Sequence, residues 1–277
     1  MVCFNLEEFL ASRVVWRVLR ILLGIPIVPY GSSELARALE TSHASATRAL
    51  RKLEQAGLCI KRKGSYRANP DQPIVRYLWL LLQAERYRNL PSDLINAIEL
   101  VTAELAEQGE AIVLFGSWAH GVADESSDID ICLFGDNARS QRLRRQSRTF
   151  EIQAFPSQEL EQPSRTVVLD AVCLGMPLKG ADLIYDAAVN VHSFPKPFLL
   201  ERLAQAQDFI VRSEDLTGPA GDYYRQLAER TLQQIDSILR QGRTVARREA
   251  TSGRPLRELC EDVSTRLAGE ADRVWLT

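Results

Sequence analysis

Two short groups of residues, each beside an apolar run, could together carry out chemistry on phosphates. Gly116-Ser117 follows the apolar run 111–115, and Asp128-Ile129-Asp130 opens the next apolar run. Side chains alternate between the two faces of a strand, so the two aspartates point one way and the isoleucine points into the core. Two carboxylates on one face can bind a hard cation. Mg²⁺ prefers oxygen ligands, commonly one or two carboxylates together with substrate phosphates.

The glycine and the serine supply the other half of such a site. Gly116 has no side chain and lets a phosphate approach the backbone, and Ser117 lies where a helix would begin, with free N–H groups and a hydroxyl facing an anion. Each pair alone is common, and the polar residues before Ile129 could be an ordinary turn. The order strand, Gly-Ser, short helix, polar turn and Asp-x-Asp strand favours a metal-dependent phosphoryl-transfer site.

Gly116-Ser117, Gly121 and Ser127-Asp128-Ile129-Asp130 resemble the signature of the DNA polymerase beta type nucleotidyltransferase superfamily, especially its minimal, stand-alone members. The resemblance covers about residues 101–186. It implies transfer of a nucleoside monophosphate from an NTP, with ATP expected, and release of pyrophosphate. It also implies that the aspartates bind Mg²⁺ (or Mn²⁺), while Gly116 and Ser117 hold the β- and γ-phosphates.

The same resemblance implies a third carboxylate on a later strand, and Glu151 fits this position. Residues 149–155 alternate in polarity and end before Pro156, so Glu151 can project from a strand towards the site. The alternative is an ordinary solvent-facing residue. We expect Glu151 to bind the metal nearer the incoming hydroxyl. His120, where minimal relatives often carry arginine, either contacts phosphate or has no role, and Trp118 either stacks on substrate or packs.

Composition is that of an ordinary soluble chain. With 277 residues, 45% hydrophobic and 25% charged, it has room for two or three domains. Five scattered cysteines and three histidines suit buried thiols in a reducing compartment and argue against zinc. The apolar stretches are too short or interrupted to span a membrane, and no signal-peptide layout is present. We therefore expect a cytoplasmic protein with no membrane partner.

Charge is segregated along the chain. Residues 1–90 carry 14 Lys+Arg against 7 Asp+Glu, residues 91–190 carry 7 against 16, and residues 191–277 carry 13 against 13. A basic first third suggests an anionic partner, and an acidic middle third suits a cation site.

The first third has the pattern of a DNA-binding module. Apolar spacing predicts helices at 13–23, 33–39 and 44–56, followed by short strands at 58–61 and 65–67 around a basic tip. Residues 32–73 resemble a winged helix-turn-helix domain of the ArsR or MarR type. Double-stranded DNA is then the expected partner, although such a domain can also serve only protein contact or dimerisation. The expected contacts are Ser42, Ser45, Thr47 and Arg48 in the major groove and Lys61, Arg62, Lys63 and Arg67 at phosphates.

The remaining segments read as helices. A long helix at 75–90 would link the domains and could form a homodimer interface, a helix at 94–108 leads into the first strand of the transferase, and helices are expected at 197–212, 223–240 and 256–267. We thus expect an α+β multidomain chain: a winged helix-turn-helix domain with its linker helix at 1–90, a mixed-sheet nucleotidyltransferase domain at 91–190 and a helical domain at 191–277.

Three functions fit these features. The first is a nucleotidyltransferase joined to a DNA-binding module and acting on a protein, RNA or small-molecule acceptor. The second is a nucleotide-sensing transcriptional regulator, and the third is a small-molecule transferase of the antibiotic-modifying kind. The complete set of carboxylates argues against pure sensing, and the basic winged helix argues against a simple drug-modifying enzyme. Related minimal transferases suggest a toxin-antitoxin setting.

Overall fold

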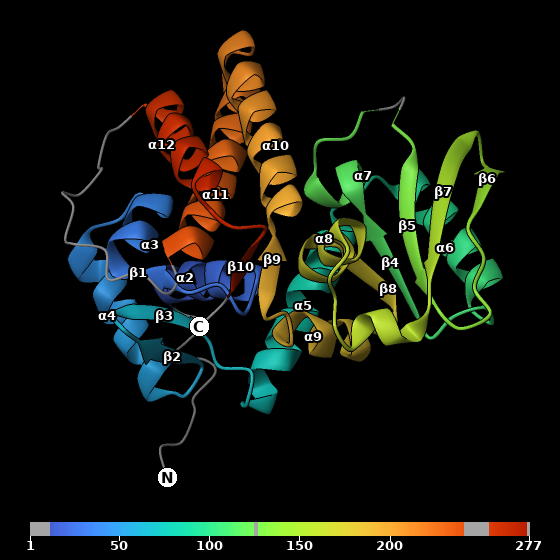
Figure 1. The fold of residues 1–277 in the computed structure, drawn as a ribbon, viewed down its shortest axis with the longest axis horizontal. Coiled ribbons are helices and arrows are strands. Elements are labelled where there is room, and N and C mark those ends of the chain that lie inside the picture. The colour runs from blue at the N-terminus through green and yellow to red at the C-terminus, as the bar shows by residue number, and fades with distance from the viewer. Residues whose placement is uncertain (1–11, 125–126, 241–254, 276–277) are drawn as a thin grey trace. The chain divides into compact units, whose positions relative to one another are not determined.

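The computed structural model describes residues 12–124, 127–240 and 255–275, and the chain divides into two compact units. The first unit comprises residues 1–22, 28–69 and 192–277, and the second comprises residues 23–27 and 70–191. Their secondary structure is shown in Figure 1. The expected mixture of an N-terminal helix-turn-helix region, a mixed sheet and C-terminal helices is confirmed.

The N-terminal part of the first unit is a winged helix. Its elements are α2 (Arg13–Gly24), β1 (Tyr30–Gly31), α3 (Ser32–Ala38), α4 (His43–Gln55), β2 (Cys59–Arg62) and β3 (Ser65–Ala68). The strands form an antiparallel sheet in the order β1-β3-β2. All the predicted helices and strands are present; β1 was not predicted, because two residues give no readable pattern.

The wing is a tight hairpin whose turn suits its residues. Arg62 pairs with Ser65, so Lys63 and Gly64 form a two-residue loop, with φ of 46° and 88°. Positive φ at both loop positions matches the twist of the flanking strands. Before the wing, Ser42 caps α4 by accepting a hydrogen bond from the Ser45 backbone N–H at 3.1 Å.

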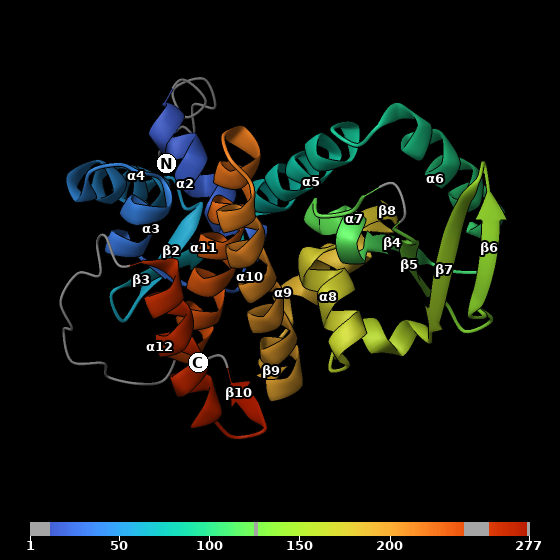
Figure 2. The ribbon, with the colours of Figure 1, turned by 90° about the horizontal axis from the view of Figure 1, so that it is seen from above.

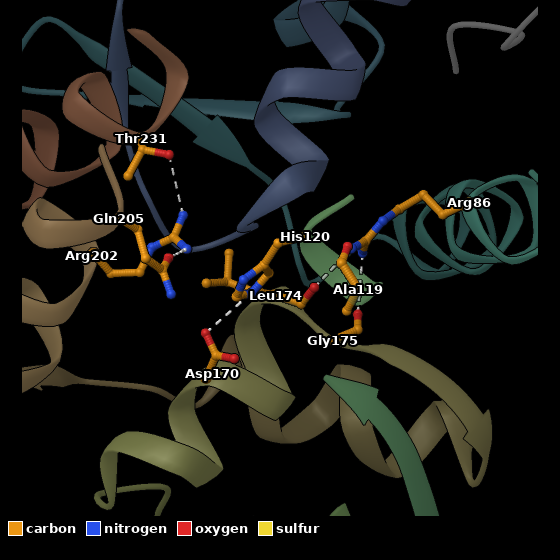
Figure 3. Close-up of polar contacts among 9 residues, drawn as sticks. All are labelled: Arg86, Ala119, His120, Asp170, Leu174, Gly175, Arg202, Gln205 and Thr231. Carbon is orange, nitrogen blue, oxygen red and sulfur yellow. Dashed lines mark hydrogen bonds and ion pairs between the residues drawn. The ribbon is translucent and has the colours of Figure 1, made fainter. Parts of the chain in front are cut away.

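The C-terminal helices belong to the same unit as the winged helix. They are α10 (Lys196–Asp215), α11 (Pro219–Arg240) and α12 (Leu256–Ala268), accompanied by the paired strands β9 (Ser193–Pro195) and β10 (Arg273–Trp275). Figure 3 shows Arg202 of α10 reaching Thr231 of α11, at 3.5 Å. Helix α11 contacts α3. Burial raises the pKa of Glu229 in α11, and the positive charge of Arg37 in α3 partly opposes this rise. The structure thus differs from the expected separate domain at 191–277.

The second unit is built on a five-stranded mixed sheet in the order β6-β7-β5-β4-β8. Strands β5 and β7 are parallel and the other pairs are antiparallel. The strands are β4 (Ala111–Phe115), β5 (Ile129–Phe134), β6 (Gln141–Arg145), β7 (Arg148–Phe155) and β8 (Met176–Lys179). The helices are α5 (Pro73–Arg88), α6 (Ser92–Leu105), α7 (Gly116–His120), the 3-10 helix η1 (Ser157–Leu160), α8 (Thr166–Leu174) and α9 (Ala181–Val189).

Helices cover both faces of this sheet. On one face, α6 packs with Ile129, Ile131 and Leu133 of β5 in a buried cluster. On the other face α8 lies against β4, and Figure 2 shows the sheet between the two helices. Because side chains alternate along β5, Asp130 points away from α6, to the face covered by α8.

Helix α5 belongs to the second unit, whereas we expected it with the winged helix at 1–90. The reason is its packing against α9. Trp79 of α5 stands edge-on to Tyr185 of α9, with ring centroids 5.4 Å apart, and Arg76 of α5 is ion-paired with Asp182 and Asp186 of α9. Within the three described ranges, every helix is too short or too polar to cross a bilayer.

Candidate active site

The Gly-Ser turn and the second aspartate of the Asp-x-Asp motif are built against each other. Strands β4 and β5 pair so that Phe115 lies opposite Asp130, and α7 begins at the next residue. Gly116 has φ of 67°, and a Cβ atom there would lie 2.3 Å from Oδ2 of Asp130. Only glycine both adopts this backbone conformation readily and leaves room for the carboxylate. Ser117 follows in the first turn of α7.

Glu151 lies beside Asp130. The parallel pairing of β5 and β7 places the two residues in direct register, so both side chains project from the same face. Asp128, the residue before β5, completes the predicted set. The register therefore brings together two carboxylates that lie 21 residues apart in the sequence.

The donor set fits a hard divalent cation that takes part of its coordination from substrate. Among the residues that the structure describes, no three His, Cys, Asp or Glu side chains are arranged to hold a metal ion by themselves. Mg²⁺ commonly takes one or two carboxylates and completes its shell with phosphates and water. A positive group already stands at the site: the Arg142 guanidinium is 2.8 Å from Oδ2 of Asp128, and Arg142 lies opposite Glu151 across β6 and β7.

Burial and the neighbouring carboxylates make Asp130 harder to ionise. Burial, together with the negative charges of Glu151, Asp128 and Asp170, raises the pKa of Asp130 to about 6. A bound divalent cation would offset this repulsion. Asp170, in α8, was not among the predicted site residues. Its only signal was a carboxylate in an otherwise apolar helix, TVVLDAVCL.

His120 is directed to α8. Its Nε2 atom lies 3.3 Å from Oδ1 of Asp170, and the two side chains are only 9% and 16% exposed. Figure 3 shows the two side chains pointing towards each other. The structure therefore places His120 close to Asp170, with no hydrogen bond to its Nε2 atom among the described residues, and this approach brings α7 against the helix that carries Asp170.

Arg86, which the sequence did not single out, holds the ends of two helices beside the site. Its guanidinium donates hydrogen bonds to the carbonyl oxygens of Ala119 at 2.9 Å, Leu174 at 2.8 Å and Gly175 at 3.2 Å (Figure 3). Helix α7 has five residues and is too short to be stable by itself. Donors at the C-terminal carbonyls of a helix satisfy groups that have no partner within it. Arg86 thus supports the turn that carries Gly116 and Ser117.

Trp118 packs rather than projecting outward. Its Nε1 donates to the Ser127 carbonyl at 3.3 Å, its ring packs against the α6 core, and the Arg148 guanidinium stands 5.2 Å from the ring centroid. Of the two roles left open by the sequence, the structure shows packing. The contact ties α7 to the residue before Asp128.

The predicted DNA contacts divide into exposed and withdrawn groups. On α4, Ser42 caps the helix, Ser45 is half-buried and Arg48 is exposed. On the wing, Lys61, Arg62 and Lys63 are exposed. Two residues are placed differently from our expectation. The hydroxyl oxygen of Thr47 is buried, because this position turns towards the core of the unit, and Arg67 is half-buried because it lies in β3, opposite Ile60, rather than at the tip.

Comparison with known families agrees with both parts of the chain. The nucleotidyltransferase domain family matches residues 95–177, and the MarR family matches residues 12–65. A search among curated proteins found no significant match. The first region holds the Gly-Ser turn and the carboxylates, and the second holds the helices and strands of the winged helix up to the start of β3. The chain therefore has a region similar to the nucleotidyltransferase domain family, behind an N-terminal winged helix that is similar to the MarR family.

Proposed function

We propose that the second unit transfers a nucleoside monophosphate from an NTP, with ATP expected, to an acceptor hydroxyl in a Mg²⁺-dependent reaction. The observation that carries the proposal is the fit between Gly116 and the Asp130 carboxylate, at the end of a strand in register with Glu151. A phosphate-binding turn in contact with a metal-binding carboxylate is the arrangement that phosphoryl transfer needs.

Each residue then has a role. Asp128 and Asp130 would hold the metal, which neutralises charge on the phosphates when bound. Gly116 and Ser117 would bind the β- and γ-phosphates through backbone N–H groups and the serine hydroxyl. Glu151 is exposed beside Asp130; in addition to binding the metal nearer the attacking hydroxyl, as expected from the sequence, it would accept the proton of that hydroxyl.

A labelling experiment tests this function. The protein is incubated with Mg²⁺ and each NTP labelled at the α-phosphate, with and without cell extract, beside the variant Asp128→Ala/Asp130→Ala. We expect label transfer by the native protein and none by the variant. Asp136→Ala removes an exposed carboxylate just after β5 and serves as the matched control. Absence of transfer from every NTP would contradict the proposal.

We also propose that the winged helix binds double-stranded DNA through α4 and the wing. Arg48, Lys61, Arg62 and Lys63 are exposed, as groups that bind phosphates or bases must be. DNA affinity should fall with salt, and Arg62→Gln/Lys63→Gln should reduce the salt slope by about 2, near 0.9 for each phosphate that the wing no longer neutralises. Arg225→Gln, at an exposed residue of α11, is the control.

A nucleotide-sensing transcriptional regulator is the second candidate, because the exposed basic residues of the wing lie in the same chain as the nucleotide site. It predicts that the native protein binds an NTP without transferring label and that the NTP changes the affinity for DNA. Under the enzyme proposal, label transfer occurs and is lost with the two aspartates.

A further inference from the structure

The hairpin of β6 and β7 concentrates positive charge in an acidic domain. Residues 91–190 contain seven Lys and Arg, and five of them lie between positions 139 and 148. Strand β6 stands at the edge of the sheet, beside β7, which carries Glu151. The five residues are Arg139, Arg142, Arg144, Arg145 and Arg148.

The arginines on the α6 face are neutralised by α6 itself. Arg145 is ion-paired with Glu104 at 2.8 Å, and Arg148 is ion-paired with Asp93 at 2.5 Å. Leu143, on the same face of β6 as Arg145, packs against the core cluster of α6. These contacts hold the hairpin of β6 and β7 against α6.

Two arginines of β6 lie on the other face, which is the face of the carboxylates. Arg142 lies opposite Glu151, and Arg144 lies opposite Thr149, so both share the face of Glu151. Both side chains are exposed, as is Arg139 in the preceding loop. Arg142 meets the site carboxylate Asp128. Within the described part of the chain, neither Arg139 nor Arg144 forms an ion pair.

We propose that Arg139, Arg142 and Arg144 bind the phosphates of a single-stranded nucleic acid whose terminal hydroxyl is the acceptor beside Glu151. This inference rests on the proposed transfer function and names its acceptor class. A polynucleotide supplies both requirements of this face, a hydroxyl for Glu151 and regularly spaced negative charges for the strand. Residues two apart in a strand are separated by about 6.8 Å, so Arg142 and Arg144 can each meet a different phosphate of the polynucleotide. Guanidinium groups also match phosphate oxygens in a bidentate geometry.

Charged residues also protect an edge strand from pairing with another chain. Protection of the edge strand needs charged residues, but it does not matter on which face of the sheet they lie. It does not account for the division found here, in which both arginines of one face are paired with α6, whereas on the face of the carboxylates Arg142 is paired with Asp128 and Arg144 forms no ion pair within the described part of the chain.

The reaction would proceed by attack of the terminal hydroxyl oxygen on the α-phosphorus of the NTP. A bond forms between that oxygen and the α-phosphorus, and the bond from the α-phosphorus to the oxygen that bridges to the β-phosphorus breaks. Pyrophosphate leaves with the bonding electrons. The hydroxyl proton passes to the Glu151 carboxylate and then to water.

Two neighbouring arginines of one strand provide a matched test. Arg144→Gln removes a charge on the carboxylate face, and Arg145→Gln removes the same charge on the α6 face. Both are made in the full chain carrying Arg62→Gln/Lys63→Gln, so that the wing does not contribute. The probe is a fluorescein-labelled single-stranded RNA, and binding is measured by anisotropy over a series of salt concentrations without NTP.

We expect Arg144→Gln to weaken RNA binding about tenfold, as removal of one charge-assisted hydrogen bond does. It should reduce the salt slope by about 0.7, the value for one phosphate of a single strand. Arg145→Gln should leave the slope unchanged. Equal losses of affinity in both variants, no RNA binding by the parent protein, or label transfer only to a protein acceptor would each overturn the inference. RNA binding is measured without NTP, so it does not depend on catalysis. If RNA binding depends on Arg144 but no label is transferred, the RNA-binding face stands, and the proposed transfer function, with its acceptor, is wrong.

Discussion

The Gly-Ser turn and the wing each depend on a glycine with a left-handed backbone, but the surroundings of the two glycines differ. At Gly116 a Cβ atom would lie 2.3 Å from the Asp130 carboxylate, whereas at Gly64 no atom lies within 4 Å of that position. The first glycine is required by its neighbours as well as by its own φ. The second is required only by its φ of 88°. The Gly-Ser turn is therefore fixed by packed contacts, whereas the wing is a local turn that carries exposed charge.

Gly116→Ala should have the largest effect. The new methyl group must displace Asp130 or the turn, so we expect label transfer to fall at least about a hundredfold, with a stability loss of about 1–3 kcal/mol for the strained backbone. Transfer rate and thermal unfolding measure the two effects. Gly24→Ala is the control, since nothing lies within 4 Å of its Cβ position. A fully active Gly116→Ala protein would remove the distinction between the two glycines.

Arg86→Met should have the next largest effect, because it removes hydrogen bonds to the ends of α7 and α8 together. Hydrogen bonds from a charged group contribute about 1.5–3 kcal/mol each. We expect faster backbone hydrogen exchange in residues 116–122 and about tenfold weaker NTP binding. Arg76→Met is the control: it lies on the same helix but pairs with α9, which carries no site residue. Unchanged exchange in α7 would show that Arg86 does not support the turn.

The stability of the metal-free protein should depend on pH through Asp130. Its pKa is about 6 in the folded protein and near 3.8 when unfolded, so the folded state binds more protons between these values. This contribution to stability is therefore present below about pH 4, declines as the pH rises and is lost above about pH 6. Because the side chain is partly exposed, we expect Asp130→Asn to add only about 1–2 kcal/mol to the free energy of unfolding at neutral pH.

Denaturant titrations of native protein and Asp130→Asn at acid and neutral pH measure this difference. Asp136→Asn, at an exposed carboxylate, is the matched control. A gain from Asp130→Asn that is equal at both pH values would show that the cost of ionising the buried Asp130 carboxyl is not its cause. Mg²⁺ binding should follow the opposite trend and weaken below about pH 6, because a carboxylate ligand must be ionised.

Gly64→Ala should have the smallest effect. An L-residue at this φ is strained by about 1 kcal/mol, but the open space around it allows the methyl group. We expect a modest loss of DNA affinity and no change in label transfer. A loss of label transfer as large as that expected for Gly116→Ala would show that transfer depends on the conformation of the wing.

The predicted parts of the fold have strong local signals. Strand β4 matches the apolar run 111–115, and β5 matches the apolar run that Asp128-Ile129-Asp130 opens, because buried strands are apolar and are ended by glycine or polar turns. The hairpin around Lys63 and Gly64, with its basic tip, also depends on neighbouring residues only. Strand β6, QRLRR, escaped prediction because it is short and charged, as an edge strand can be.

The missing parts of the site come from residues with no local signal. Arg86 lies 33 positions before Ala119 and 88 before Leu174, and Asp170 lies 40 positions after Asp130. Each is an ordinary helical residue until the chain folds. Nothing along the sequence pairs them with the Gly-Ser turn.

The sequence by itself determined the types of chemistry available: a glycine and serine for phosphates, carboxylates for a cation and a basic hairpin for a nucleic acid. These follow from residue type, period and spacing, which are local. Only the tertiary structure decided which groups act together. Strand register placed Glu151 beside Asp130, and the alternation of side chains sent Arg142 and Arg144 to the carboxylate face. The physical reason is that register and helix packing are set by burial of the whole apolar surface, and one residue of slip would send every side chain of a strand to the other face.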